Sequence, residues 1–232
     1  MKRILLKLSG EALSGDKGHG FDDETCLGVA AQVRKLTQRG IEVAIVIGGG
    51  NFWRGRTSES MDRVRADQIG MLATVMNCLY VSDAFRRTGM DTCIMTPFVC
   101  GSFASLYDRD SAVKALEEGK VVFFAGGTGN PYFSTDTATS LRAIEIQADV
   151  IMLAKAVDGI YDSDPKIHPE AKRYERISIQ EVIDKRLAAM DLSASIMCME
   201  NHMPMFVFAL AGEDSILHAI EQDGVGTWVS VD

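Results

Sequence analysis

Three apolar segments of this chain each end in a loop that contains glycine, and this repeated junction constrains the fold more than any other feature. The segments span residues 3–8, 41–47 and 121–125, and the loops begin at Ser9, Gly48 and Gly126. Short apolar runs are typical of strands buried on both faces of a parallel sheet. In such a sheet, ligands bind beyond the carboxyl ends of the strands. The pattern therefore predicts an open α/β sheet with a binding site at that edge.

The loops are suited to bind an anion. Glycine lets the backbone approach a ligand closely, and a helix N-terminus presents unpaired N–H groups to it. The loop at Gly126 adds the hydroxyl groups of Ser134 and Thr135 just before a predicted helix. For one loop alone, a plain turn with a helix cap explains the residues equally well. The recurrence of such loops after three strands favours a phosphate site.

Strand and helix patterns alternate along the chain. Helices are predicted for residues 24–37, 66–87, 110–118, 137–147, 178–185 and 192–201, and further strands for 91–96, 150–153, 205–210 and, as a final edge strand, 227–231. This alternation implies a mainly parallel sheet with helices on both faces, a three-layer α/β/α sandwich. Residues 155–176 lack periodicity, and loops of this length are usually functional. The 232 residues fit one large domain or two small lobes.

Composition argues against several classes of protein. The net charge of −8 is unlike that of a nucleic-acid-binding surface, which is usually basic. Five cysteines, an odd number with no CxxC pair, indicate reduced thiols rather than a disulfide framework. The chain has no apolar run of membrane-spanning length, no signal-peptide pattern and no pair of histidines at metal-ligand spacing. We therefore expect a cytoplasmic protein without a membrane or nucleic-acid partner.

Several cationic residues are candidates for phosphate chemistry. Lys7 interrupts the first apolar strand just before its loop, where it either points to solvent or neutralises phosphate oxygens. Arg54 and Arg56 follow the Gly48 loop, and a guanidinium fork suits phosphate. Phosphoryl transfer needs mainly aligned phosphates and neutralised charge. The patterns GxxxxGK[ST] and GxGxxG are absent, so a phosphate site here is of another design.

Acidic residues add a second set of candidates. Asp67 is either a first-turn acid of the long predicted helix or an acceptor for ribose hydroxyls. Asp136 and Asp191 each stand where a helix begins, and helix capping is the favoured interpretation of both. In residues 158–165, Tyr161 is suited to stack on a base and the acids to bind ribose, although a turn-rich surface loop has the same composition.

Five motifs together resemble those of the bacterial uridylate (UMP) kinases, a family of the amino acid kinase superfamily. They are Lys7-Leu8-Ser9-Gly10-Glu11, Gly48-Gly49-Gly50-Asn51 with Arg54-Gly55, Gly127-Thr128-Gly129-Asn130-Pro131 through Thr135-Asp136, Val157-Asp158-Gly159 and Met190-Asp191-Leu192. The motifs occur in the family's order and span nearly the whole chain. The third is the most specific, because it separates the UMP kinases from carbamate, acetylglutamate and aspartate kinases.

The resemblance implies one amino acid kinase domain over residues 1–232, with an acceptor-side lobe at roughly 1–150 and an ATP-nucleoside-side lobe at roughly 151–232. It implies transfer of the γ-phosphoryl group of ATP to UMP, which gives UDP in pyrimidine nucleotide biosynthesis. Mg²⁺ would arrive with ATP and not at a protein metal site. The family usually assembles as a homohexamer.

The resemblance also implies roles for individual residues. Catalytic roles fall on Lys7, Arg54, Asp136 and Asp191. ATP binding falls on Lys7, Leu8, Ser9, Gly10, Gly50, Arg54, Lys155, Tyr161 and Asp164. UMP binding falls on Gly49, Asp67, Thr128, Gly129, Asn130, Pro131, Tyr132, Phe133, Ser134 and Thr135. Trp53 departs from the family pattern, which often has a smaller apolar residue there.

Two other functions remain open from the sequence. One is a kinase of the same superfamily that acts on carbamate or an amino acid. The other is a non-catalytic nucleotide- or oxyanion-binding protein with this fold. The glycines and hydroxyls of the Gly127 motif suit a nucleotide phosphate better than a small acid. A non-catalytic relative need not keep Lys7, Arg54 and Asp136 together, whereas this chain has all three.

Overall fold

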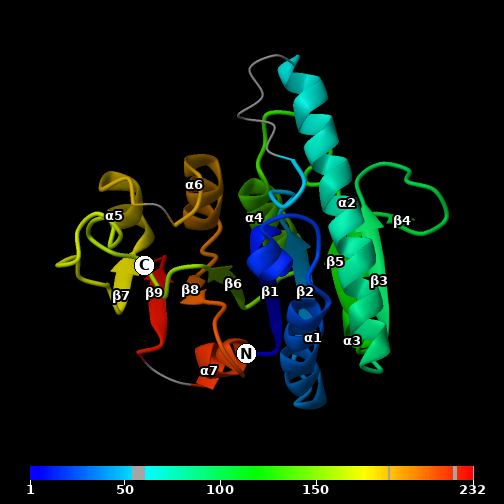
Figure 1. Ribbon diagram of the computed structural model, residues 1–232, viewed down its shortest axis with the longest axis horizontal. Helices are drawn as coiled ribbons and strands as arrows, with labels where there is room; N and C mark the ends of the chain where they lie inside the picture. The colour runs from blue at the N-terminus through cyan, green and yellow to red at the C-terminus, as the bar shows by residue number, and fades with distance from the viewer. Residues whose placement is uncertain (54–60, 188, 222–223, 232) are drawn as a thin grey trace.

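Nine strands form one sheet in the described part of the computed structural model, which covers residues 1–53, 61–187, 189–221 and 224–231 (Figure 1). The strands are β1 (Arg3–Leu8), β2 (Glu42–Ile47), β3 (Thr92–Thr96), β4 (Ser105–Leu106), β5 (Val121–Phe124), β6 (Val150–Lys155), β7 (Arg176–Ser178), β8 (Met205–Ala209) and β9 (Gly226–Ser230). Their order across the sheet is β4-β3-β5-β2-β1-β6-β8-β9-β7. Neighbouring strands are parallel except for β8 and β9, which are antiparallel. The predicted mainly parallel sheet is confirmed.

Helices cover both faces of this sheet. They are α1 (Asp23–Gln38), α2 (Arg63–Arg87), α3 (Arg109–Glu117), α4 (Thr135–Glu145), α5 (Ile179–Asp184), α6 (Leu192–Glu200) and α7 (Ser215–Glu221), and a 3₁₀ helix, η1 (Glu11–Lys17), follows β1. Helices α1, α2 and α7 pack on one face, and α3, α4, α5 and α6 pack on the other (Figure 1). The three-layer α/β/α sandwich is therefore confirmed. Among the described residues, none of these helices combines the length and apolar character needed to cross a bilayer.

The central strands are buried on both faces, which explains their uninterrupted apolar sequences. In β1, Ile4 and Leu6 face the core below α1 and α2, whereas Leu5 faces the core on the other side. All four residues of β5 are buried. Burial of one large apolar side chain stabilises the fold by about 1.5–3 kcal/mol. Lys7 is the exception in β1, because its side chain is only partly buried and binds an acid beyond the strand end.

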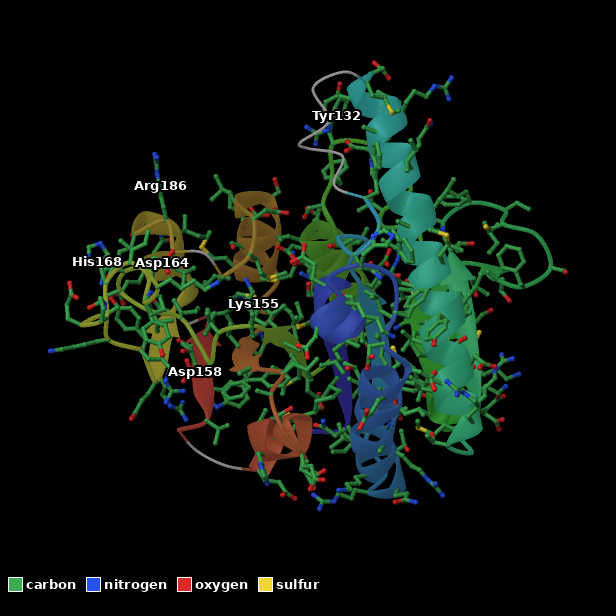
Figure 2. The ribbon with its side chains drawn as sticks, in the orientation of Figure 1. Tyr132, Lys155, Asp158, Asp164, His168 and Arg186 are labelled. Carbon is green, nitrogen blue, oxygen red and sulfur yellow. The ribbon has the colours of Figure 1, made fainter. Side chains whose placement is uncertain are left out.

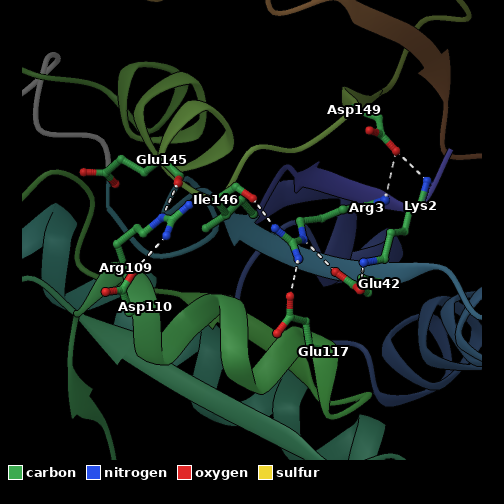
Figure 3. Close-up of polar contacts among 9 residues, drawn as sticks. All are labelled: Lys2, Arg3, Glu42, Arg109, Asp110, Glu117, Glu145, Ile146 and Asp149. Carbon is green, nitrogen blue, oxygen red and sulfur yellow. Dashed lines mark hydrogen bonds and ion pairs between the residues drawn. The ribbon is translucent and has the colours of Figure 1, made fainter.

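The amino ends of the strands are held by a charged network at the edge opposite the glycine loops (Figure 3). Arg3 is 8% exposed, and its Nε donates to Glu42 Oε2 at 2.6 Å. The same guanidinium donates to the carbonyl oxygen of Ile146, and its Nη2 lies 3.8 Å from Glu117 Oε1. Asp149 accepts a hydrogen bond from the Arg3 N–H at 3.0 Å. These contacts give the buried guanidinium group of Arg3 acidic and carbonyl partners, and they join β1 and β2 to the ends of α3 and α4.

The predicted position of the last strand is wrong. β9 is not at the sheet edge, because β7 pairs with its outer side and places Ile177 opposite Val229. The sequence patterns also did not predict β4, β7, η1 and α7. These elements have two, three, seven and seven residues. Helical periodicity is most reliable over a window of about 11–18 residues, and none of these four elements stood out by periodicity or by an uninterrupted apolar run.

Candidate active site

The carboxyl ends of four central strands meet at one edge of the sheet and carry the site. β5, β2, β1 and β6 are neighbours in that order and are parallel. Their loops therefore leave the sheet side by side, at its upper edge in Figure 1. The structure brings together the three predicted glycine loops, which begin at Ser9, Gly48 and Gly126, and the end of β6 at Lys155.

Lys7 and Asp136 form an ion pair at this edge. Lys7 Nζ on β1 lies 2.8 Å from Asp136 Oδ1 in the first turn of α4, and the two side chains are only 15% and 21% exposed. Burial raises the pKa of Asp136, but the charge and hydrogen bond of Lys7, the charge of Lys155 and the Asp191 N–H together outweigh this effect. The pKa therefore lies below its ordinary value of 3.8. Asp136 is therefore ionised at neutral pH and holds the Lys7 ammonium group at the strand end.

Two helix N-termini meet beside this pair. Ser134 is the N-cap of α4, and its hydroxyl accepts hydrogen bonds from the N–H groups of Asp136 and Thr137 at 3.0 and 3.3 Å. Asp191 is the N-cap of α6, and its Oδ1 accepts from the Ala194 N–H at 2.9 Å. The Ser134 hydroxyl donates to Asp191 and so joins the two caps. The capping interpretation is confirmed for Asp191 and wrong for Asp136, because Ser134 occupies the cap position. Helix N-termini favour an anion at this place.

Lys155 supplies a second partly buried ammonium group. Its Nζ donates to the carbonyl oxygen of Ala189, and Figure 2 shows it between Asp158 and the loop that carries Tyr132. Burial lowers the pKa of Lys155 and Lys7 lowers it further, whereas the attraction of Asp136 raises it. The net pKa lies below the ordinary value of 10.5. Charged groups from β1, α4 and β6 thus act on one another at this edge.

Close packing, and not an unusual backbone angle, explains Gly10 and Gly49 in the first two loops. A Cβ at Gly10 would lie 2.4 Å from both the Gly48 carbonyl oxygen and Asn51 Oδ1, and one at Gly49 would lie 3.1 Å from the Gly70 carbonyl oxygen. The glycines at 10 and 48–50 have no positive φ. These glycines therefore do not serve to give the backbone a left-handed conformation. Only the smallest residue lets these two loops and α2 approach one another.

The third loop is held against α2 by its own backbone. Gly126 and Gly129 have φ values of 79° and 82°, in the left-handed region that favours glycine. The Gly126 N–H donates to Thr74 Oγ1 at 2.8 Å, and the Tyr132 N–H donates to Asp67 Oδ2 at 2.7 Å. The interpretation of Asp67 as a first-turn acid is wrong, because α2 begins at Arg63 and has no acid in its first turn. Its carboxylate instead holds the loop that the resemblance assigns to UMP.

A cavity of about 150 Å³ opens between α2 and these loops. Its lining includes the predicted residues Gly49, Asp67, Thr128, Phe133, Ser134 and Thr135. It also includes Trp53, Arg63, Gly70, Met71, Thr74 and Gly127, which were not among the predicted site residues. The residues of α2 repeat at helical spacing from Asp67, a signal that could have found them. The predicted Gly129, Asn130, Pro131 and Tyr132 belong to the same loop but do not line the cavity.

A second cavity, of about 510 Å³, lies on the other side of Lys155. Both predicted residues of this region, Tyr161 and Asp164, line it, and Figure 2 shows Asp164 far from Tyr132. The Tyr161 hydroxyl donates to Asp158 Oδ1 at 2.7 Å. Lys166, Lys185 and Arg186 also line this cavity and bring positive charge to it.

The remaining predicted residues differ in what they can contribute. Leu8 is fully buried, so only its backbone is available to a ligand, and Ser9 is half-buried at the start of the loop. A Cβ at Gly50 would lie 2.8 Å from Glu11 Oε1, so this position too is closely packed. Arg54, a predicted catalytic residue, and Arg56 lie outside the described residues.

The carboxylates of the site suit a metal that arrives with phosphate. Among the described residues, no cluster of three or more His, Cys, Asp or Glu side chains could hold a metal ion. Asp136 is engaged by Lys7 and by the Asp191 N–H at 3.3 Å, and Asp191 by Ser134 and Ala194. Mg²⁺ in kinases usually keeps waters and phosphate oxygens as ligands and needs only one or two carboxylates. The donor set fits Mg²⁺ carried by ATP.

Comparison with known proteins identifies relatives of this chain and its fold. Residues 2–209 match the model of the amino acid kinase family. A UMP kinase from Bacillus anthracis superposes with a TM-score of 0.95 at 36% sequence identity, over 100% of this chain and 96% of that one. A UMP kinase from Ureaplasma parvum superposes with a TM-score of 0.93 at 35% identity, over 99% and 98% of the two chains. The chain therefore belongs to the amino acid kinase family.

Proposed function

We propose that this protein is a UMP kinase, which transfers the γ-phosphoryl group of ATP to UMP and releases ADP and UDP. The observation that carries the proposal is the position of Lys7 and Asp136 between two cavities. The first cavity is built on the loops after β2 and β5, and the second on the loop after β6. β1, which carries Lys7, lies between β2 and β6. The two solved UMP kinases, which share the fold over 96% and 98% of their own length, support the same substrates.

The proposed reaction is a direct in-line displacement. An oxygen of the UMP phosphate attacks the γ-phosphorus of ATP, the bond to the bridging oxygen breaks, and ADP leaves with the electron pair. The acceptor is already a nucleophile, so no phosphoenzyme is needed, and catalysis is mostly positioning and charge stabilisation. Lys7 neutralises charge on the transferred group, and Asp136 holds Lys7 in place. Asp191 holds Ser134 at the start of α4, and Arg54 adds a guanidinium fork for phosphate.

In this proposal UMP occupies the first cavity and the ATP nucleoside the second. The ATP phosphates lie over Lys7, Gly10 and Gly50, and Lys155 adds charge at the donor side. Mg²⁺ carried by ATP would add further positive charge at the phosphates. Residues at roughly 1–150 then form the acceptor side and residues at roughly 151–232 the ATP-nucleoside side.

We also propose a homo-oligomer, with a hexamer expected from the family resemblance. Ile69, Leu72 and Met76 are 36%, 52% and 46% exposed. Their spacing places them on one face of α2, and an exposed apolar face often marks a protein–protein interface. A cytoplasmic location belongs to the same proposal, because all five cysteines are free thiols, as is usual in a reducing compartment.

A coupled assay of nucleoside diphosphate formation tests the proposed function. Acceptors should include UMP, CMP, dUMP, carbamate and N-acetylglutamate, each with ATP and Mg²⁺. We expect UMP to be far preferred. Equal turnover of CMP would contradict the substrate assignment, and turnover of a small acid would favour another kinase of the family. Tight calorimetric binding of UMP and ATP without product would favour the non-catalytic alternative.

A further inference from the structure

A reciprocal pair of side-chain amides is buried beneath the first two glycine loops. Asn77, on α2, is fully buried, and Asn51, just after Gly50, is 2% exposed. Asn77 Nδ2 donates to Asn51 Oδ1 at 2.7 Å, and Asn51 Nδ2 donates to Asn77 Oδ1 at 3.0 Å. The mechanism above gives neither side chain a role.

Each amide also binds one backbone carbonyl. Asn77 Nδ2 donates to the Gly48 carbonyl oxygen at 2.6 Å, and Asn51 Nδ2 donates to the Gly20 carbonyl oxygen at 2.8 Å. A carbonyl can only accept, so these contacts fix which end of each amide is the NH₂ group. All four N–H bonds of the pair are then used, and every buried side-chain N and O atom of the described residues has a partner. A fully satisfied network in a low-dielectric interior is rigid.

This pair sets the spacing between the two loops. Gly48 begins the loop after β2, and its N–H donates to the Leu8 carbonyl oxygen at 3.0 Å. Gly10, in the loop after β1, packs directly on the amides, because a Cβ there would lie 2.4 Å from Asn51 Oδ1 and 2.9 Å from Asn77 Nδ2. The two amides are thus the surface against which both loops are held.

We propose that Asn51 and Asn77 are positioning residues, which hold the donor and acceptor phosphates at the spacing that in-line transfer requires. The inference rests on the proposed function, in which Gly10 lies at the ATP phosphates and Gly49 at UMP. A misplacement of about 1 Å can lower a rate by about 100-fold. Loss of the pair lets the loops shift relative to each other without removing a group that touches either nucleotide. The signature is a lower kcat with nearly unchanged KM values.

The test compares Asn77→Ala, Asn51→Ser and the double variant with wild type. It measures kcat, both KM values, calorimetric affinities for UMP and for ATP, and the affinity of an analogue that joins adenosine and uridine through five phosphates. We expect kcat to fall about 10–100-fold and analogue binding to weaken about 10-fold or more, with each single nucleotide within about threefold. Because the amides act as one unit, the double variant should be no worse than the worse single variant.

Gln32→Ala is the matched control. Gln32 is another buried amide, on α1, whose Oε1 accepts from the Ile216 N–H at 2.8 Å on the α7 side of the molecule. Its loss should lower the melting temperature by a similar amount while leaving kcat and analogue affinity within about threefold of wild type. An equal loss of kcat in Gln32→Ala would overturn the proposal, because destabilisation alone would explain the effect. If Asn77→Ala does not fold, the milder Asn51→Ser carries the same comparison.

The outcomes separate this inference from the proposed function. Wild-type protein that makes no UDP refutes the proposed function, and analogue binding still tests the amide pair. A different result overturns the amide-pair proposal alone. In it, wild-type protein makes UDP, and both single variants keep kcat and analogue affinity within about threefold of wild type. A loss of single-nucleotide affinity as large as the loss of analogue affinity also overturns it.

Discussion

Lys7→Met is the substitution that tests the centre of the site most directly. Methionine keeps much of the apolar length of the lysine but removes the ammonium group that binds Asp136 at 2.8 Å. Loss of one donor to charge that develops in a transition state costs about 2.7–4 kcal/mol, which is a roughly 10²–10³-fold lower kcat. KM for UMP should change little, because the first cavity lies between α2 and the loops and does not include Lys7.

The same substitution leaves the Asp136 carboxylate without its main partner. Removing one member of a buried ion pair costs about 3–5 kcal/mol. The two side chains retain 15% and 21% exposure, and Lys155 still attracts Asp136, so solvent screening should reduce this to about 1–3 kcal/mol. For a chain of this size, the melting temperature should fall by about 2–4 °C for each kcal/mol. Lys7→Met combined with Asp136→Asn removes the unpaired charge, so it should recover stability without recovering turnover.

The assay is coupled UDP formation at saturating ATP, Mg²⁺ and UMP, with thermal unfolding of each variant. Lys35→Met is the matched control, because it breaks a surface ion pair of 2.6 Å with Asp214 on the α7 side of the molecule. The control should keep full turnover. A folded Lys7→Met protein with kcat within tenfold of wild type would refute the role of Lys7. Recovery of turnover in the double variant would show that Lys7 acts only on stability.

Three further predictions follow from the geometry. Gly10→Ala forces a Cβ to 2.4 Å from Asn51 Oδ1, so the protein should lose about 1–3 kcal/mol or more of stability and most of its turnover; unchanged thermal unfolding would contradict the packing argument. The pKa of Asp136 is lowered below 3.8, so its ionised form adds stability above that pH, and this stability is lost as the pH falls through the lower folded value. The Asp136→Asn variant should lack this pH-dependent contribution to stability. The difference in melting temperature between wild type and the variant should therefore shrink between pH 5 and pH 3, and a constant difference would disprove the prediction. Leu72→Glu places a charge on the exposed apolar face of α2 and should yield smaller assemblies by light scattering, whereas an unchanged mass would exclude that face as the interface.

Much of the fold was predictable because strong local patterns coincide with the elements. The uninterrupted apolar run of β5 and the helical spacing of apolar residues in α2 are patterns that loops rarely have. Each element lies within a few residues of its predicted bounds. β7 failed because three residues hold no period, and β9 was misplaced because the chain offers no local sign of a strand that pairs beyond it. Asp136 was misread as a cap because Ser134, two residues earlier, has equal capping propensity.

Local chemistry was enough to indicate a parallel sheet with glycine loops at one edge, since strand burial and glycine placement are properties of short segments. The pairing of Lys7 with Asp136, residues 129 positions apart in the chain, depends on β1 and α4 meeting, and no segment encodes that distance. The same is true of Asn77, whose sequence context is an ordinary helix and whose partners lie in two loops. Contacts between distant segments decided which polar groups became buried, paired and charged, because burial and electrostatic environment arise only when the whole chain has packed.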